Sequence, residues 1–327
     1  MEKQHSGRSS FSGKLGFVLS AAGASVGLGN IWRFPYLAAK YGGGIFLLIY
    51  ILLAVTFGYT MIMAETALGR MTRKSPVGAF AAFGKGRWRA FGGWINAVIP
   101  ILIVPYYSVI GGWVIKYLAG DITGHGSELA QDGDFSSFIA NGASVEIVFL
   151  LFTLLTLGII FAGVRNGVER VSRMMMPVLV VLSVIIAAYS VTRPGALEGV
   201  KYFLVPNPAN FSWMTVVTAM GQMFYSLSIA MGILVTFGSY MKKDVSIEGS
   251  TENVEIFDTL IAMMAGLMII PAVFSFSGGD PDTLQAGPAL MFITIPKVFE
   301  SMELGSLVGV LFFVLVLFAA ITSSIAL

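Results

Sequence analysis

The chain contains no cysteine and only two histidines in 327 residues. The absence of cysteine excludes disulfides, thiolate metal sites and cysteine nucleophiles. His5 lies in the polar N-terminal tail and His125 in a loop between apolar segments, so no catalytic triad or metal cluster can be assembled from these residue types. Glycine-rich stretches exist, but Gly42-Gly43-Gly44 lacks the following Lys-Ser or Lys-Thr of a phosphate loop. We therefore do not expect an enzyme.

Charged residues are also scarce. They make up 12% of the chain, against roughly 25% in an ordinary soluble domain, while 56% of the residues are hydrophobic. A globule of this size cannot hide that much apolar surface, which indicates a lipid bilayer as the solvent. The polar segment 1–14 leads directly into an apolar stretch without a small-residue cleavage site, so it does not resemble a signal peptide. The net charge is only +2, and we expect no nucleic-acid partner.

Eight apolar segments are long enough to span a membrane, because a bilayer core needs about 20 apolar residues per helix. Their approximate ranges are 14–36, 43–69, 90–118, 144–163, 174–192, 213–240, 254–276 and 304–327. The pattern predicts an all-α fold, a polytopic transmembrane helical bundle. The last segment stops at Leu327 without the polar flank that usually closes a span, so we expect a chain that is truncated within its eighth helix.

The loop charges predict an orientation. With the N-terminus in the cytoplasm, the inner loops carry the basic residues Arg70, Arg73, Lys74, Lys85, Arg87, Arg89, Arg165, Arg170, Lys242 and Lys243. The outer loop 119–144 carries four acidic residues and no Lys or Arg, and Asp280 and Asp282 follow near Gly278. Because cytoplasmic loops hold an excess of Lys and Arg, we expect a multi-pass protein of the inner (plasma) membrane.

Two of the apolar spans contain residues that do not favour a regular membrane helix. The first has three glycines and an amide in the stretch from Gly23 to Asn30, and the sixth has polar residues and glycines from Gly221 to Gly232. Glycine lowers helix propensity by about 1 kcal/mol, although small residues also serve close helix packing. Paired interruptions in corresponding halves indicate a transporter built from inverted repeats, with its binding site between the breaks.

Two carboxylates lie within the apolar spans, Glu65 in the second and Asp258 in the seventh. Each costs about 2.5 to 3.5 kcal/mol or more unless it is paired. For Glu65 we favour a structural role as acceptor for backbone N–H groups freed by the break near 221–232, with direct ion binding as the alternative. For Asp258 we favour an ion-binding role. Thr322 and Ser323 on the last helix are a weak signal alone, because such hydroxyls often bond to their own helix.

Six short motifs resemble those of the neurotransmitter:sodium symporters and fall in that family's order and spacing across essentially the whole chain. They are residues 27–35 with glycines 42–44, residues 65–70, residues 105–107, residues 222–228, residues 238–244 and residues 322–324. The resemblance implies a leucine-transporter-like inverted-repeat fold with broken helices 1 and 6. One transporter domain would span 1–327, with a first repeat at about 14–192 and a partial second repeat at about 213–327, lacking its C-terminal helices.

The resemblance also implies two sodium sites. The first site would use the Ser25 carbonyl, the side chains of Asn30, Ser226 and Asp258, and the carboxylate of the substrate. The second would use the carbonyls of Gly23, Val26 and Ala319 with the hydroxyls of Thr322 and Ser323. Both are all-oxygen sets, which suit a hard cation.

The substrate implied by the resemblance is an amino acid. It would lie against Ser25, Leu28, Gly29 and Ser226, with its carboxylate bound by Tyr107 and by backbone N–H groups. Its side chain would fill a pocket made by Ile103, Tyr225, Ser228, Met231 and Leu327. Gly27 stands where monoamine transporters of the family have an aspartate, which favours a substrate that brings its own carboxylate. Met231 offers a soft wall, so we expect apolar or aromatic amino acids, and Tyr225 leaves the choice among them open.

Gate and charge-compensation residues follow from the same resemblance. Arg33 resembles the basic half of the extracellular gate, and Arg8 with Phe11 resembles the cytoplasmic latch, although Arg8 also suits a positive-inside anchor. Chloride-dependent members bind the anion with residues matching Tyr50, Gln222 and Ser226 and with a serine whose position here is Ala262. Because Asp258 supplies a permanent negative charge beside that position, with Glu65 as a second intramembrane carboxylate, we expect chloride-independent, sodium-coupled symport.

A non-transporting relative remains the main alternative: a substrate-binding sensor or a channel-like protein built on the same helices. The sequence does not distinguish these from a symporter, and it gives no oligomeric state.

Overall fold

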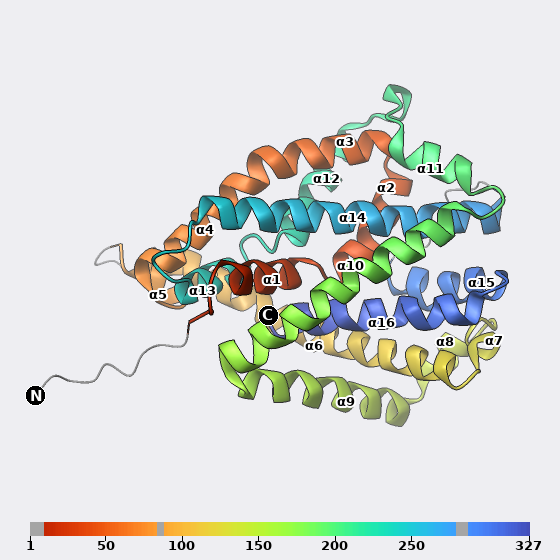
Figure 1. The fold of residues 1–327 in the computed structure, drawn as a ribbon, viewed down its shortest axis with the longest axis horizontal. Coiled ribbons are helices and arrows are strands. Elements are labelled where there is room, and N and C mark those ends of the chain that lie inside the picture. The colour runs from red at the N-terminus through yellow and green to blue at the C-terminus, as the bar shows by residue number, and fades with distance from the viewer. Residues whose placement is uncertain (1–9, 84–87, 279–286) are drawn as a thin grey trace, which may run out of the picture.

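The structure is a computed structural model that describes residues 10–83, 88–278 and 287–327, and all of its regular elements within these ranges are helical (Figure 1). The first half contains α1 (Lys14–Ser25), η1 (Gly29–Arg33), α2 (Phe34–Lys40), α3 (Gly44–Leu53), η2 (Ala54–Gly58), α4 (Tyr59–Thr72), α5 (Pro76–Ala81), α6 (Arg89–Ile122), α7 (Gly126–Leu129), α8 (Asp134–Ala140), α9 (Gly142–Phe161), η3 (Val164–Glu169) and α10 (Arg170–Val191). The second half contains α11 (Ala196–Leu204), η4 (Pro208–Asn210), α12 (Trp213–Ser226), α13 (Ile233–Tyr240), α14 (Glu248–Ser277), η6 (Leu290–Thr294), α15 (Ile295–Glu300) and α16 (Gly305–Ser324).

Six helices of the described chain are long and apolar enough to cross a membrane: Gly44–Thr72, Ala90–Ile122, Gly142–Phe161, Val164–Val191, Glu248–Ser277 and Gly305–Ser324. The other two expected spans, 14–36 and 213–240, are the interrupted ones. The fifth and seventh helices begin earlier than their apolar runs, at Val164 and Glu248 instead of 174 and 254. Hydropathy marks only the apolar part of a helix, and Arg170, Arg173, Glu248 and Glu252 lie in the turns that it leaves out.

The first span is broken where the glycines and the amide predicted it. Helix α1 ends at Ser25, the chain resumes a helical path at Gly29, and the two parts are bent by 53°. Val26 closes α1 in an extended conformation, with its N–H donating to the Ala22 carbonyl at 2.7 Å. The last carbonyls of α1 therefore lack the N–H groups that a continuing helix would supply.

The sixth span is interrupted more deeply. Helix α12 ends at Ser226 and α13 begins at Ile233, which leaves residues 227–232 outside any helix. Ser228, Ala230 and Gly232 have positive φ angles of 55°, 62° and 73°. Two of these are not glycine, and left-handed backbone is uncommon for such residues. The surrounding structure must therefore hold this segment in place.

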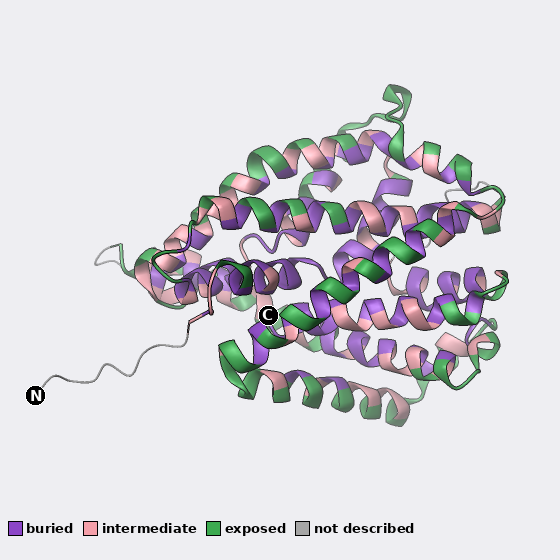
Figure 2. Ribbon diagram, in the orientation of Figure 1, coloured by how far each residue is buried: buried purple, intermediate pink, exposed green. Residues whose placement is uncertain are grey.

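The breaks lie in the middle of the bundle. In Figure 1, α1, α10, α14 and α16 surround the interrupted regions, while α9 lies at the periphery. Figure 2 shows that α9 is mostly exposed and that α1, the inner faces of α14 and α16, and the breaks are buried. The buried polar residues gather with them, including Asn30, Gln222, Ser226 and Asp258, each at most 1% exposed. A polar centre inside an apolar bundle is the arrangement of a solute-binding site rather than of a simple core.

The loop charges separate to the two ends of the bundle. The N-terminal segment, α5 and the α13–α14 connection lie at one end in Figure 1, and α7, α8 and α15 lie at the other. At the second end Lys116 pairs with Asp134 at 2.6 Å and Lys297 pairs with Asp132. The bond from Lys297 lowers the pKa of the Asp132 carboxyl. Lys85, Arg87, Asp280 and Asp282 lie outside the described residues, as does the side chain of Arg89.

Candidate functional site

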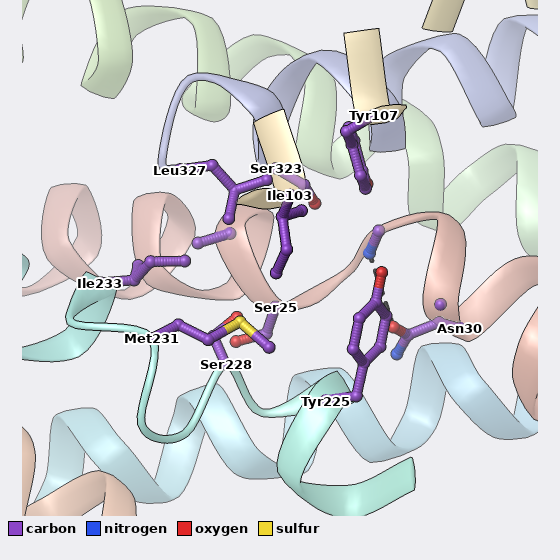
Figure 3. A pocket seen from close by; sticks show the side chains of 13 residues that line it. Ser25, Asn30, Ile103, Tyr107, Tyr225, Ser228, Met231, Ile233, Ser323 and Leu327 are labelled. Carbon is purple, nitrogen blue, oxygen red and sulfur yellow. Dashed lines mark hydrogen bonds between the residues drawn. The ribbon is translucent and has the colours of Figure 1, made fainter. Parts of the chain in front are cut away.

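A small cavity lies between the two breaks. It is closed by residues of α1, α6, α12, the 227–232 segment and the end of α16 (Figure 3). The lining residues are Ala24, Ser25, Gly27, Gly29, Asn30, Ile103, Tyr107, Tyr225, Ser228, Met231, Ile233, Ser323 and Leu327. Eight of the ten predicted substrate contacts line it. The exceptions, Leu28 and Ser226, are each 1% exposed and lie just behind the wall. The sequence missed Ala24 and Ile233, which are ordinary apolar residues with no distinguishing pattern.

The cavity is tight. Its free volume is about 30 Å³, which is room for about two water molecules. Met231 and Ser228 approach from the interrupted segment and Ile103 and Tyr107 from α6, as Figure 3 shows. A bulky side chain can enter only if these walls move apart. Methionine is the side chain best suited to such movement, because it is unbranched and has three rotatable bonds.

Asp258 is the centre of a buried hydrogen-bond cluster. It is 0% exposed, and its Oδ1 accepts a bond of 2.8 Å from Asn30 Nδ2. Its Oδ2 accepts bonds from the hydroxyls of Ser226 at 2.7 Å and Tyr50 at 3.2 Å. The structure thus brings together the three side chains predicted for the first sodium site. The neighbouring Ser25 hydroxyl donates to the Ala21 carbonyl of its own helix at 3.1 Å.

Ser323 joins the last helix to the first break. Its hydroxyl lies 3.2 Å from both the Gly23 and Val26 carbonyl oxygens, 300 and 297 residues away in the chain. Thr322 Oγ1 lies 3.2 Å from the Ala319 carbonyl and 2.8 Å from that of Phe318. The five predicted ligands of the second sodium site therefore lie together. The Thr322 hydroxyl bonds to its own helix, as anticipated for an isolated Thr, but Ser323 does not.

Tyr107 and the first break are in direct contact. The Leu28 N–H donates to the Tyr107 hydroxyl oxygen at 3.1 Å. A Cβ built at Gly27 would lie 2.5 Å from Ser323 Oγ and 2.7 Å from the same Tyr107 oxygen. A Cβ at Gly29 would lie 2.4 Å from the Tyr225 ring. A side chain at either position would fit only if Ser323, Tyr107 or the Tyr225 ring moved away.

Arg33 and Tyr225 lie beside this cavity. The Arg33 guanidinium carbon is 5.0 Å from the centre of the Tyr225 ring, within cation–π distance. The Tyr225 hydroxyl is 3.0 Å from that of Tyr106. Tyr225 therefore lies between the predicted basic gate residue and the cavity, a position that the sequence alone did not give.

The predicted latch is described only in part. Arg8 lies outside the described residues. Phe11 is 1% exposed and packs edge-on against Phe17, Phe237 and Tyr240, and its N–H donates to the Tyr240 carbonyl at 3.2 Å. An aromatic residue at this position thus fastens the N-terminal segment to α13.

Sequence reasoning missed Glu169, which is 2% exposed. Its carboxylate accepts from the Ser12 N–H at 2.8 Å and from the Ser12 hydroxyl, and it pairs with Arg173 at 3.1 Å. It stands between the basic inner-loop residues Arg165 and Arg170, and no motif distinguishes it from a surface acid. The available signal was its position shortly after Asn166 and Gly167, next to the basic residue Arg170.

Glu65 binds the interrupted segment. Its Oε1 accepts from the Ala230 N–H at 2.7 Å, which is the structural contact that we expected. Its Oε2 has no hydrogen-bond partner among the described residues. Within the same residues, no group of three His, Asp or Glu side chains is placed to hold a metal ion.

The fold matches a solved transporter. The crystal structure of MhsT in complex with L-phenylalanine superposes with a TM-score of 0.87 at 37% sequence identity, covering 98% of this chain and 73% of that one. The helical bundle, its broken spans and this match define a multi-pass membrane transporter with the leucine-transporter-like fold. The expected fold class is therefore confirmed.

Sequence comparisons give the family. Residues 8–128 and 133–327 match the model of the sodium:neurotransmitter symporter family. The chain is 38% identical over 314 residues to YhdH, a sodium-dependent transporter of Bacillus subtilis, covering 95% of this chain and 69% of the relative. It is 33% identical to a sodium-dependent transporter of Haemophilus influenzae, covering 97% and 72%. The chain belongs to the sodium:neurotransmitter symporter family. It is a sodium-dependent symporter of a small-molecule substrate, and not an enzyme.

Proposed function

We propose that this protein couples the inward sodium gradient to the uptake of apolar or aromatic amino acids by alternating access. The observation that carries the proposal is the meeting of both breaks at one cavity, where Tyr107, Ser323 and the Asp258 cluster surround a small apolar pocket. The similarity to MhsT, solved with L-phenylalanine, supports an amino acid of this class.

The cavity chemistry supports a zwitterionic substrate. Because a side chain at Gly27 would collide with Ser323 and Tyr107, the wall cannot provide the carboxylate that an amine without its own acid would need. The Tyr107 hydroxyl and the backbone of the first break are available for a substrate carboxylate instead. Ile103, Met231 and Leu327 make the opposite side apolar, which favours an apolar side chain there.

We propose two sodium sites. The first comprises the Ser25 carbonyl and the side chains of Asn30, Ser226 and Asp258, and the second comprises the Gly23, Val26 and Ala319 carbonyls with Thr322 and Ser323. The hydrogen bonds of these side chains support both groupings, since Asp258 accepts from Asn30 and Ser226 and Ser323 donates to the Gly23 and Val26 carbonyls. Hard cations prefer such oxygen sets.

Chloride independence is supported by the partners of the residues that match the family's chloride ligands. Tyr50 and Ser226 both donate to Asp258, and Gln222 Nε2 donates to the Gly29 carbonyl at 3.1 Å. Ala262 is buried and offers no hydroxyl. The Asp258 carboxylate thus already accepts the hydrogen bonds that a chloride ion would need. At an effective dielectric of about 20, the interaction of the Asp258 carboxylate with another unit charge some 4 Å away is worth roughly 4 kcal/mol.

The remaining parts of the proposal concern architecture. We place the protein in the inner (plasma) membrane with a cytoplasmic N-terminus, because the basic loops share one end of the bundle. We interpret residues 14–192 and 213–327 as a first repeat and part of a second, since each begins with a broken span. Gating by Arg33 and Arg8 belongs to the same proposal.

Uptake measurements on proteoliposomes test the function. Saturable accumulation of phenylalanine or leucine should require an inward sodium gradient. Full-rate accumulation with sodium replaced by choline, driven by protons alone, would refute sodium coupling. A sensor would bind without accumulating, and a channel would not saturate.

Ion replacement tests the charge assignment. Replacing chloride by gluconate at fixed sodium should leave substrate affinity and uptake unchanged, whereas Asp258→Asn should impair both. The control is Glu252→Gln, which removes an exposed carboxylate from the same helix. Strong stimulation of the wild type by chloride would contradict the proposal.

A further inference from the structure

A groove runs along α4 at the end of the bundle that carries the basic loops. Its apolar wall is formed by Ala64, Ala67, Leu68 and Met71 of α4 and by Ile247 just before α14. Its rim is formed by Arg70 and Lys243. The groove measures about 590 Å³, and we refer to it as the α4 groove.

The spacing of the α4 residues explains why they form one continuous wall. Positions 64, 67, 68 and 71 are separated by three, four and seven residues, so they form one stripe on the helix surface. The two alanines are smaller than Leu68 and Met71, which follow them on the same stripe, and Met71 is 65% exposed. Because α4 belongs to the membrane-spanning helix Gly44–Thr72, this stripe lies at the end of a span, where the hydrocarbon meets the headgroups.

The rim carries two cations. Arg70 Nη1 donates to the Val245 carbonyl, and Nη2 donates to that of Lys243 at 3.3 Å. The guanidinium therefore holds the 243–245 backbone against α4 without being neutralised, since neither it nor Lys243 forms an ion pair in the described part of the chain. Lys243 is exposed, so its ammonium is free to reach a ligand.

The other charges around the rim are mixed. Arg73, Lys74 and Lys242 lie on the same two connections, and Lys242 Nζ donates to the Ser12 carbonyl at 2.8 Å. Asp244, Glu248 and Glu252 are the acidic neighbours. Five cations against three anions leave the rim net positive.

We propose that the α4 groove binds an anionic phospholipid, with its phosphate at Lys243 and Arg70 and an acyl chain along the alanine stripe. An apolar wall alone would accept any lipid, but two unpaired cations at its headgroup end select one with net negative charge. Basic pockets between membrane helices bind anionic headgroups, and each Lys or Arg near the surface adds to the attraction. None of the residues that line the groove lines the cavity between the breaks, and the proposal does not depend on the transported substrate.

The test is a lipid titration of the purified protein by native mass spectrometry. The dissociation constant for the first bound phosphatidylglycerol should be lower than for phosphatidylcholine, and Lys243→Gln should raise it about fivefold, which corresponds to about 1 kcal/mol for one cation near the surface. The matched control Lys201→Gln removes an exposed lysine at the opposite end and should leave it unchanged. Ala67→Leu, which fills the wall, should weaken phosphatidylglycerol binding without changing any charge.

Three results would overturn the proposal. Equal affinities for the two lipids would show that the rim does not select charge. Equal effects of Lys243→Gln and Lys201→Gln would assign the attraction to overall charge. Displacement of phosphatidylglycerol by glycerol phosphate at the same concentration would show a site for a soluble anion instead of a lipid. Unchanged thermal unfolding of the variants in lipid-free detergent ensures that each result reports binding.

Discussion

At the centre of this protein, close contacts with neighbouring atoms limit which side chain a position can hold more than the functional group of that side chain does. Gly27 and Gly29 carry no functional group, yet the atoms facing them belong to Ser323, Tyr107 and Tyr225. Asp258 and Ser323 have functional groups, and each forms a hydrogen bond to the first span, which is distant from it in the sequence. At this scale the site is a set of close approaches, so small changes in side-chain volume should have large effects on binding.

Gly27→Ala should therefore impair function. Its Cβ would lie 2.5 Å from Ser323 Oγ, and relief of such overpacking costs about 1–3 kcal/mol. We expect substrate affinity to fall about tenfold, measured by binding of radiolabelled substrate in detergent. Gly221→Ala is the matched control, because a Cβ there meets nothing within 4 Å. Equal affinities of Gly27→Ala and wild type would show that the cavity wall is elsewhere.

Ser323→Ala should weaken the second sodium site while three carbonyls remain. The loss of one oxygen ligand, taken as about 1 kcal/mol, predicts about a fivefold higher half-saturating sodium concentration. Ser324→Ala serves as control, since the Ser324 hydroxyl makes no hydrogen bond to α1 in the described chain. If sodium dependence is the same in both variants, the site is misplaced.

The break in the sixth span and the N-terminal segment are each held by contacts from other elements. The break in the sixth span has left-handed residues that are not glycine, Ser228 and Ala230, and Glu65 supplies an acceptor for the Ala230 N–H. The N-terminal segment is held by Phe11 packing and by the bonds from Ser12 to Glu169. Such elements need tertiary partners, because their own sequence does not favour the observed backbone.

Glu65 gives a test at this scale. Glu65→Leu removes the acceptor and leaves a buried N–H unpaired, which should lower the free energy of unfolding by about 1–3 kcal/mol. Glu65→Gln keeps an acceptor oxygen, so stability and sodium affinity should stay close to wild type. Thermal unfolding and sodium titration of both variants are the measurements. A large loss of sodium affinity in Glu65→Gln, with stability unchanged, would favour the alternative of direct ion binding.

The whole molecule separates charge between its two ends, and this separation predicts its orientation in the membrane. Because the chain has no cysteine, single cysteines report accessibility without background. In intact cells, a membrane-impermeant maleimide should label Ser127→Cys at the end with α7 and α8, and not Ser75→Cys between α4 and α5. Both positions are exposed, so permeabilised cells should show labelling of both. The reverse pattern in intact cells would place the N-terminus outside.

The sequence alone determined much of this protein. The apolar runs and the loop charges indicated a membrane bundle, and glycines and polar residues in two spans located both breaks to within a few residues. These are local properties, so they are visible in a linear pattern. The sixth span is the clearest case, because Gly221 to Gly232 combines poor helix formers with polar side chains, and the helix stops at Ser226 within that range.

Only the tertiary structure decided which distant groups meet. Ser323 donates to two carbonyls about 300 residues away, Asp258 accepts hydrogen bonds from Tyr50 and Ser226, and Glu169 accepts from Ser12 across 157 positions. The helix starts at Val164 and Glu248 were also hidden, since charged first turns do not differ from loops in hydropathy. Local propensity fixes where helices break, whereas packing of the bundle decides what each freed carbonyl or buried carboxylate binds.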